Sequence, residues 1–121
     1  MAFFTLSKQE RLKSKKLIEK LFISGKSTFA HPIKLMYLEL TDLDTPLKMS
    51  VTVPKRHFKS AFDRNLLKRR MREAYRQNKV DLENKLISEK RNIALMLIFV
   101  AKEQDSYNSI ETAVKKLLRR L

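Results

Sequence analysis

Hydrophobic residues recur at helical spacing in three segments of the chain. The first begins after Ser14, a residue type suited to capping a helix N-terminus, and stops at Gly25, the only glycine. Its apolar positions are Leu17, Ile18, Leu21 and Phe22. The second segment covers residues 64–79, and the third covers residues 109–121. Spacings of three and four residues place such side chains on one face, so the pattern predicts three amphipathic helices.

Three other segments predict β-strands. Residues 33–40 form a mostly apolar run, and residues 47–53 alternate between apolar and polar side chains. Residues 93–100 are continuously apolar, which is typical of a central strand buried on both faces or of one strand of a parallel pair. Because connections are usually short, the first two strands are expected to be antiparallel neighbours. Residues 80–92 are predicted to be a polar connection or the tail of the preceding helix followed by a turn.

The alternating strand predicts two different faces for the sheet. Leu47, Met49, Val51 and Val53 would point to one side, and Lys48, Ser50 and Thr52 to the other. One face of the sheet is therefore expected to be packed, and the opposite face to be polar, basic and open.

Composition limits the class of protein. A length of 121 residues corresponds to a single domain, 1–121, and the absence of cysteine excludes disulfides, thiolate metal sites and cysteine nucleophiles. No apolar run approaches the length of a membrane span. The N-terminal sequence MAFFTLSKQERLK carries no export signal, so a cytoplasmic location is expected.

Positive charge is concentrated in the first two thirds of the chain. The formal net charge is +14, with 19 basic and 7 acidic residues in 1–79 but 8 and 6 in 80–121. Such an excess favours a polyanionic partner. An anionic membrane surface is the main alternative, but the apolar face of the most basic helix is too modest for membrane insertion.

The second predicted helix is the most informative segment. Its buried stripe is predicted to be Leu67, Met71, Ala74 and Tyr75. The opposite arc, about 100° wide, is predicted to carry Asn65, Lys68, Arg69, Arg72, Arg76 and Lys79. Like charges at i,i+4 repel each other, so the arc is expected to be neutralised by an anion. The spacing therefore indicates a phosphate-binding face.

The sequence shows no candidate for catalysis by the protein itself. The two histidines, His31 and His57, have no carboxylate or second histidine at a suitable spacing, and a single glycine cannot build a phosphate-binding loop.

The segment RNLLKRRMREAYR at residues 64–76 resembles the RNxxKRxxRE signature of the bacterial ribonuclease P protein family. The similarity extends to SKKLIEKLFISGKS, SVTVPKR, IALMLIFVAK and the closing amphipathic helix, in the same order. The resemblance implies a single α+β domain of order α-β-β-β-α-β-α, with helices packed on a small central sheet. It also implies a left-handed βαβ crossover that carries the signature helix.

The resemblance further implies a function. The protein would be the noncatalytic subunit of ribonuclease P, an endoribonuclease that removes the 5′ leader from precursor tRNA. Its partners would be the ribonuclease P RNA, with one protein per RNA, and the single-stranded leader. The hydrolysis would be carried by the RNA, with Mg²⁺ that the RNA requires and that the protein does not bind tightly.

The signature positions are implied to contact the RNA subunit: Arg64, Asn65, Lys68, Arg69, Arg72 and Arg76. A cleft between the first helix and the sheet is implied to bind the leader through Arg11, Lys15, Ile18, Phe22, Tyr37, Lys48, Ser50, Thr52, Lys55 and Arg56. Phe22 and Tyr37 match the aromatic positions of this cleft, where bases can stack. The chain departs from the family at Ile18, which replaces a common aromatic, and at Leu66, which replaces a common basic residue.

Two other functions remain compatible with a basic helix. The chain could be a general or ribosomal RNA-binding protein without a processing role, or a DNA-binding regulator that reads the major groove with residues 64–76.

Overall fold

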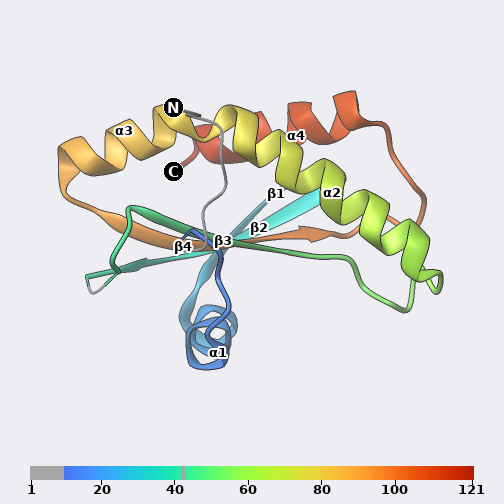
Figure 1. The fold of residues 1–121 in the computed structure, drawn as a ribbon, viewed down its shortest axis with the longest axis horizontal. Coiled ribbons are helices and arrows are strands. Elements are labelled where there is room, and N and C mark those ends of the chain that lie inside the picture. Colours follow the sequence, from blue (N-terminus) through green and yellow to red (C-terminus); the bar gives the residue numbers. More distant parts are fainter. Residues whose placement is uncertain (1–9, 42) are drawn as a thin grey trace.

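The computed structural model describes residues 10–41 and 43–121, which form four strands and four helices (Figure 1). Their order is α1 (Lys15–Ser24), β1 (Lys26–Ala30), β2 (Ile33–Leu40), β3 (Leu47–Thr52), α2 (Ala61–Asn78), α3 (Val80–Glu89), β4 (Asn92–Phe99) and α4 (Tyr107–Arg119). The expected α+β class is confirmed, and so are the three predicted helices and three predicted strands.

The strands form one sheet in the order β1-β2-β4-β3. β4 pairs with β2 in antiparallel and with β3 in parallel fashion. The predicted pairing of β2 with β3 is therefore wrong, because β4 lies between them. An apolar strand such as β4 is best shielded from water when it has a strand on each side and helices on both faces of the sheet. The chain passes from β3 to β4 through α2 and α3, and the left-handed sense of this crossover stays a prediction.

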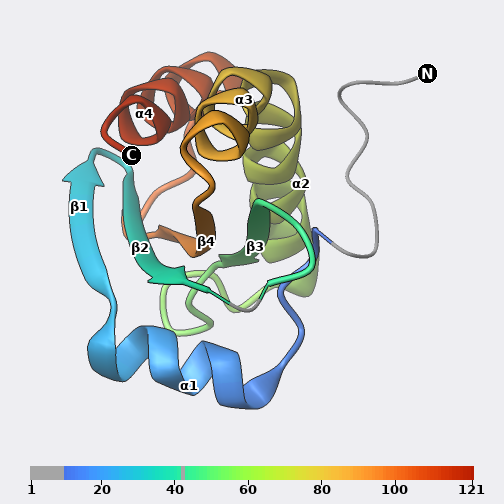
Figure 2. The same ribbon diagram turned by 90° about the vertical axis from the view of Figure 1, so that its left-hand side faces the viewer.

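Helices cover both faces of the sheet (Figure 2). On one face, α2, α3 and α4 pack over the larger hydrophobic cluster, which includes Leu35, Leu67 and Leu95. On the other face, α1 packs over a smaller cluster that includes Leu21, Met36 and Met96. The expected open face is thus partly covered by α1, and only the part beyond this helix is open.

Two elements were not predicted from the hydrophobic pattern. Residues 80–92, expected to be a connection, contain helix α3, in which Leu82 and Leu86 are buried one turn apart. Strand β1 is a mostly polar strand at the edge of the sheet. The hydrophobic pattern predicted only two strands between the first two helices, whereas the family resemblance implied three. The observed order is therefore α-β-β-β-α-α-β-α, with one helix more than expected.

Both ends of α1 follow from single residues. The Ser14 side chain accepts a hydrogen bond from Leu17 N at 3.3 Å, which confirms the predicted N-cap. Gly25 caps the other end with φ −72°, so it is not the left-handed residue that often ends a helix. A Cβ at Gly25 would lie 2.2 Å from the Leu21 carbonyl oxygen, so lack of space explains the glycine.

The chain just before α1 extends the sheet beyond β3. Leu12 N donates to Met49 O at 2.8 Å, and Met49 N donates to Glu10 O at 2.7 Å. The Glu10 carboxylate also accepts a hydrogen bond from the ammonium group of Lys79, a residue that is 1% exposed. The Lys79 Nζ atom lies 3.7 Å from Glu83 Oε1. Lys79 was predicted to lie on the exposed basic arc, and this prediction is wrong. The two carboxylates draw its side chain inward.

Candidate nucleic-acid interface

Helix α2 presents one buried and one exposed face. The four predicted stripe residues, Leu67, Met71, Ala74 and Tyr75, are all buried. The helix begins earlier than the basic pattern suggested, because the Ser60 side chain accepts from Asp63 N at 3.4 Å. Asp63 is consequently a first-turn residue, where its negative charge suits the helix dipole.

Four residues of the predicted arc are available for a partner. Asn65, Arg69 and Arg72 are exposed and Lys68 is half-buried. Within residues 10–41 and 43–121, the side chains of these four make no hydrogen bond or ion pair with the rest of the protein. Arginine forks match phosphate oxygens in geometry and charge, so this surface is suited to a nucleic-acid backbone.

Two other arginines of the predicted set already have partners in the protein. Arg76 donates from Nε to Glu73 Oε2 at 3.1 Å, and this hydrogen bond lowers the pKa of the Glu73 carboxyl below its usual value. Arg64 donates to the carbonyl oxygens of Phe58 and Lys59 at 2.8 and 2.9 Å. Arg64 therefore orders the chain that leads into α2, and the positive charge of Arg76 is neutralised by Glu73.

An aromatic side chain beside the arc was not singled out from the sequence. Phe62 is 76% exposed in the first turn of α2. It precedes Asn65 by three residues and Arg69 by seven, which places it on the same side of the helix as both. The sequence signal that could have identified Phe62 is this spacing, which places an aromatic residue on the same helical face as Arg69.

The polar residues of β3 face α1, as predicted. Lys48, Ser50 and Thr52 are paired in register with Ala94, Met96 and Ile98, whose side chains belong to the cluster beneath α1. Thr52 Oγ1 lies 3.4 Å from Met96 Sδ on this face. Lys48 forms an ion pair of 3.2 Å with Asp44.

Helix α1 contributes one exposed aromatic ring to this region. Phe22 is 52% exposed, Lys15 is exposed, and Ile18 packs partly against the cluster beneath the helix. An aromatic ring that is half-exposed is available for stacking, whereas a core residue would be covered.

Tyr37 does not lie in the predicted cleft. It is paired with Leu95 and packs against the larger cluster, on the side of the sheet covered by α2, α3 and α4. Its neighbour Met36 faces α1 instead. The prediction for Tyr37 is wrong by one position in the strand, and one position reverses the direction of a side chain.

The remaining predicted residues lie around β3. Lys55 and Arg56 are exposed in the turn after the strand, where Arg56 Nε donates to His57 Nε2 at 3.3 Å. Arg11 lines a hollow of about 340 Å³ together with Ser50 and Arg72. This hollow connects the residues predicted to bind the leader with those predicted to bind the RNA subunit.

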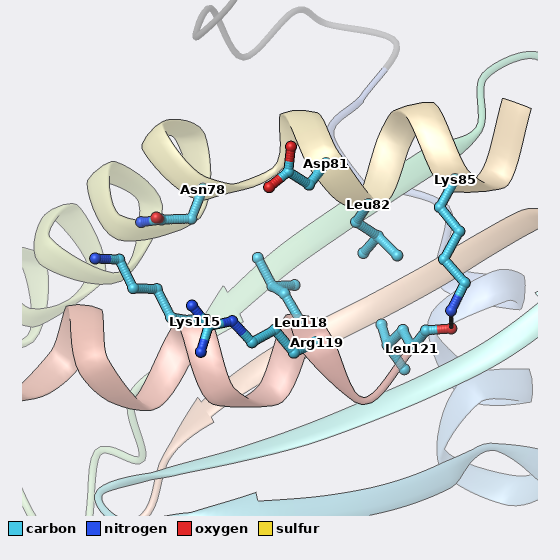
Figure 3. Close-up of a pocket in the computed structure, with 8 residues that line it drawn as sticks. All are labelled: Asn78, Asp81, Leu82, Lys85, Lys115, Leu118, Arg119 and Leu121. Carbon is cyan, nitrogen blue, oxygen red and sulfur yellow. Dashed lines mark hydrogen bonds between the residues drawn. The ribbon is translucent and has the colours of Figure 1, made fainter.

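A second hollow lies between α3 and α4 (Figure 3). Its volume is about 190 Å³, and two of the polar side chains that line it, Asn78 and Lys85, are hydrogen-bonded to the protein. Lys85 Nζ donates to Leu121 O at 3.1 Å, and Asn78 donates to Ala74 O and Glu111 Oε2 at 2.7 and 3.1 Å. It is therefore a less suitable site for a charged ligand than the surface of α2.

Two kinds of feature are absent from residues 10–41 and 43–121. No three side chains among His, Asp and Glu come together at a spacing that could hold a metal ion. None of the described helices is long and apolar enough to cross a membrane.

Comparison with known proteins decides between the possible families. The family model described as Ribonuclease P matches residues 6–121. The chain belongs to the ribonuclease P protein family. The ribonuclease P protein component of Porphyromonas gingivalis is 35% identical over 99% of this chain and 88% of its own length. That of Chlorobium phaeobacteroides is 39% identical over 64% of this chain and 56% of its own length.

Solved structures of ribonuclease P proteins share the fold. The protein from Thermotoga maritima superposes with a TM-score of 0.73 at 22% identity, covering 93% of this chain and 97% of that one. A mutant protein from Staphylococcus aureus gives 0.75 at 18% identity, covering 93% and 88%. The expected family, and with it the function as a protein component of ribonuclease P, is confirmed. A general RNA-binding role is not favoured.

Proposed function

We propose that the chain binds the ribonuclease P RNA through the exposed face of α2 and the single-stranded 5′ leader of precursor tRNA through the face of the sheet beside α1. One protein would bind one RNA molecule, and the complex would act in the cytoplasm. In this proposal the protein increases substrate affinity, and the complex hydrolyses the phosphodiester bond that joins the leader to the tRNA.

The observation that carries the proposal is the unpaired cationic arc. Lys68, Arg69 and Arg72 follow one another on one face of α2 without a carboxylate partner among the described residues. Repulsion between Lys68 and Arg72, an i,i+4 pair, destabilises the free protein by a few tenths of a kcal/mol. A phosphate backbone would remove this repulsion and release condensed counterions.

The chemical step is assigned to the RNA subunit. Mg²⁺ held mainly by the RNA would activate water and stabilise the leaving oxygen, as metal ions generally do in phosphodiester hydrolysis. The side chains described here would position the leader and the RNA rather than transfer protons.

Reconstitution with a bacterial ribonuclease P RNA tests the proposal. The protein should raise leader cleavage at low Mg²⁺ and should increase the affinity of the complex for precursor tRNA relative to mature tRNA. Unchanged cleavage, or equal affinity for both tRNAs, would contradict it. Competition by duplex DNA as strong as that by RNA would favour a DNA-binding regulator instead.

A charge-matched pair of variants locates the RNA-binding face. Arg69→Ala with Arg72→Ala removes two exposed cations from α2, and Lys116→Ala with Arg119→Ala removes two from α4. The proposal expects the first variant to lose affinity for the RNA subunit and the second to retain it. Equal losses would indicate non-specific attraction to the net positive charge.

A further inference from the structure

The face of the sheet beside α1 carries a row of four side chains that crosses every strand. Phe29 of β1 is paired with Lys34 of β2, Lys34 with Ile98 of β4, and Ile98 with Thr52 of β3. Side chains opposite each other in neighbouring strands point to the same face. Because Ile98 packs against the cluster beneath α1, all four project to the side of the sheet where α1 lies.

Helix α1 leaves this row open. The next row toward the helix contains Met36 and Met96, which are 8% and 3% exposed. Phe29, in contrast, is 52% exposed, and Lys34, Ile98 and Thr52 are each partly exposed. Figure 1 shows α1 end-on beneath the middle of the sheet, so that the ends of the strands extend past it.

Phe29 is not required by the packing of the protein. It lies on an edge strand, its ring is half in solvent, and its one aromatic contact among the described residues is with His31, edge to face at 6.4 Å between centroids. Lys34 makes no hydrogen bond or ion pair within the described parts of the chain. An open aromatic ring beside an unpaired cation is the combination that holds an unpaired nucleotide, by stacking the base and neutralising a phosphate.

We propose that Phe29 and Lys34 form an outer nucleotide-binding site at the β1 edge of the sheet. The site binds single-stranded RNA, continuing the surface that begins at Ser50 and Thr52. This inference rests on the proposed function, which it extends to a strand that the predicted cleft did not include. It also supplies a second exposed aromatic on this face, where Tyr37 is absent because it points to the other side.

The dimensions of the row fit a nucleic-acid strand rather than a single small ligand. Three spacings between neighbouring strands correspond to about 14 Å from β1 to β3. Stacked bases repeat at about 3.4 Å, so the row is longer than one nucleotide. A duplex would not satisfy Phe29, since its bases are already stacked on each other.

The test uses the reconstituted complex and precursor tRNAs whose leaders increase in length. Phe29→Ala should lower affinity by about 5- to 150-fold for leaders long enough to reach β1, the range for loss of one base–aromatic stack. It should leave the shortest leaders and mature tRNA unaffected. Lys34→Ala should reduce the log–log salt slope by about 0.7, as expected for one phosphate contact on a single strand.

A fluorescent variant reports on the site directly. The chain has no tryptophan, so Phe29→Trp introduces one reporter that also retains stacking. Its emission should be quenched by precursor tRNA and not by mature tRNA. Ile87→Trp is the control, because Ile87 is 59% exposed on α3, on the opposite face of the sheet.

The outcomes separate this inference from the proposed function. Suppose that the affinity of the wild-type complex grows with leader length and that the Phe29→Ala complex binds each leader as tightly as wild type does. The leader is then bound elsewhere and the inference is wrong. If the wild-type complex does not distinguish precursor from mature tRNA, the proposed function itself fails. If Phe29→Ala lowered the affinity for precursor and mature tRNA equally, Phe29 would have a structural role and the inference would be overturned.

Discussion

Arg72 and the Arg76–Glu73 pair should contribute differently to binding of the RNA subunit, although they are one helical turn apart. Arg72 is exposed and makes no hydrogen bond or ion pair within residues 10–41 and 43–121, so Arg72→Ala removes one full positive charge without breaking a contact in the protein. Stability should change by less than about 0.5 kcal/mol. Replacing Glu73 and Arg76 together by glutamine removes a neutral pair and should leave RNA affinity nearly unchanged.

The size of the Arg72 effect follows from its exposure. An exposed contact between arginine and phosphate contributes about 1 kcal/mol at low salt, or about fivefold in affinity. One lost phosphate contact reduces the log–log salt slope by about 0.9. Raising the salt fourfold, from about 50 to about 200 mM, should therefore shrink the difference between wild type and Arg72→Ala by about 3.5-fold.

The measurement is a titration of the labelled RNA subunit with each variant over this salt range, together with thermal melting of the proteins alone. A salt slope for Arg72→Ala equal to that of wild type would exclude Arg72 from the phosphate contacts. A loss in the Glu73 and Arg76 double variant as large as that of Arg72→Ala would show that Arg76 leaves its carboxylate to bind RNA. Either result would refute the assignment of contacts from the free structure.

Three further outcomes are expected. Phe22→Ala should cost about 1–3 kcal/mol of precursor binding without changing thermal stability, and a large drop in melting temperature would instead make Phe22 a core residue. Lys79→Met should lower the free energy of unfolding by about 3 kcal/mol in urea titrations, because Glu10 and Glu83 lose their buried partner, and adding Glu10→Gln and Glu83→Gln should restore much of it. Burial raises the pKa of Glu83 above its ordinary 4.5, so this residue stabilises the fold at low pH and that contribution is lost as pH rises through the raised pKa. Glu83→Gln should therefore flatten the pH dependence of the urea midpoint above about pH 4.5, and an unchanged profile would contradict this cause.

The elements that the sequence predicted best are those in which one face is buried and the opposite face is exposed to solvent. The stripe of α2 and the alternation of β3 both have this property, so periodicity alone located their buried residues. In β2 both faces are apolar, and Met36 and Tyr37 are adjacent, so no alternation identified which of them faces α1. The family resemblance implied that the Tyr37 ring lies in the cleft, but Tyr37 packs on the opposite face of the sheet, and its neighbours Met36 and Leu38 are not aromatic.

Long-range partners account for the other errors. Lys79 is spaced like an exposed arc residue, and its burial depends on Glu10, 69 residues away in the sequence. The pairing of β2 with β3 followed the short connection between them, whereas β4 inserts between them from residues 92–99. The alignment of Phe29 with Lys34, Ile98 and Thr52 follows only from the register of all four strands. None of these relations has a local signature.

The central position of β4 determines when the sheet can exist during synthesis. The hairpin of β1 and β2 and the separate strand β3 share no strand partner until β4 has been made. The segments before β4, including the arginine-rich helix, must therefore leave the ribosome before the hydrophobic layers can close. The packing of the arginine-rich helix α2 onto the sheet is therefore completed only after β4 has been made.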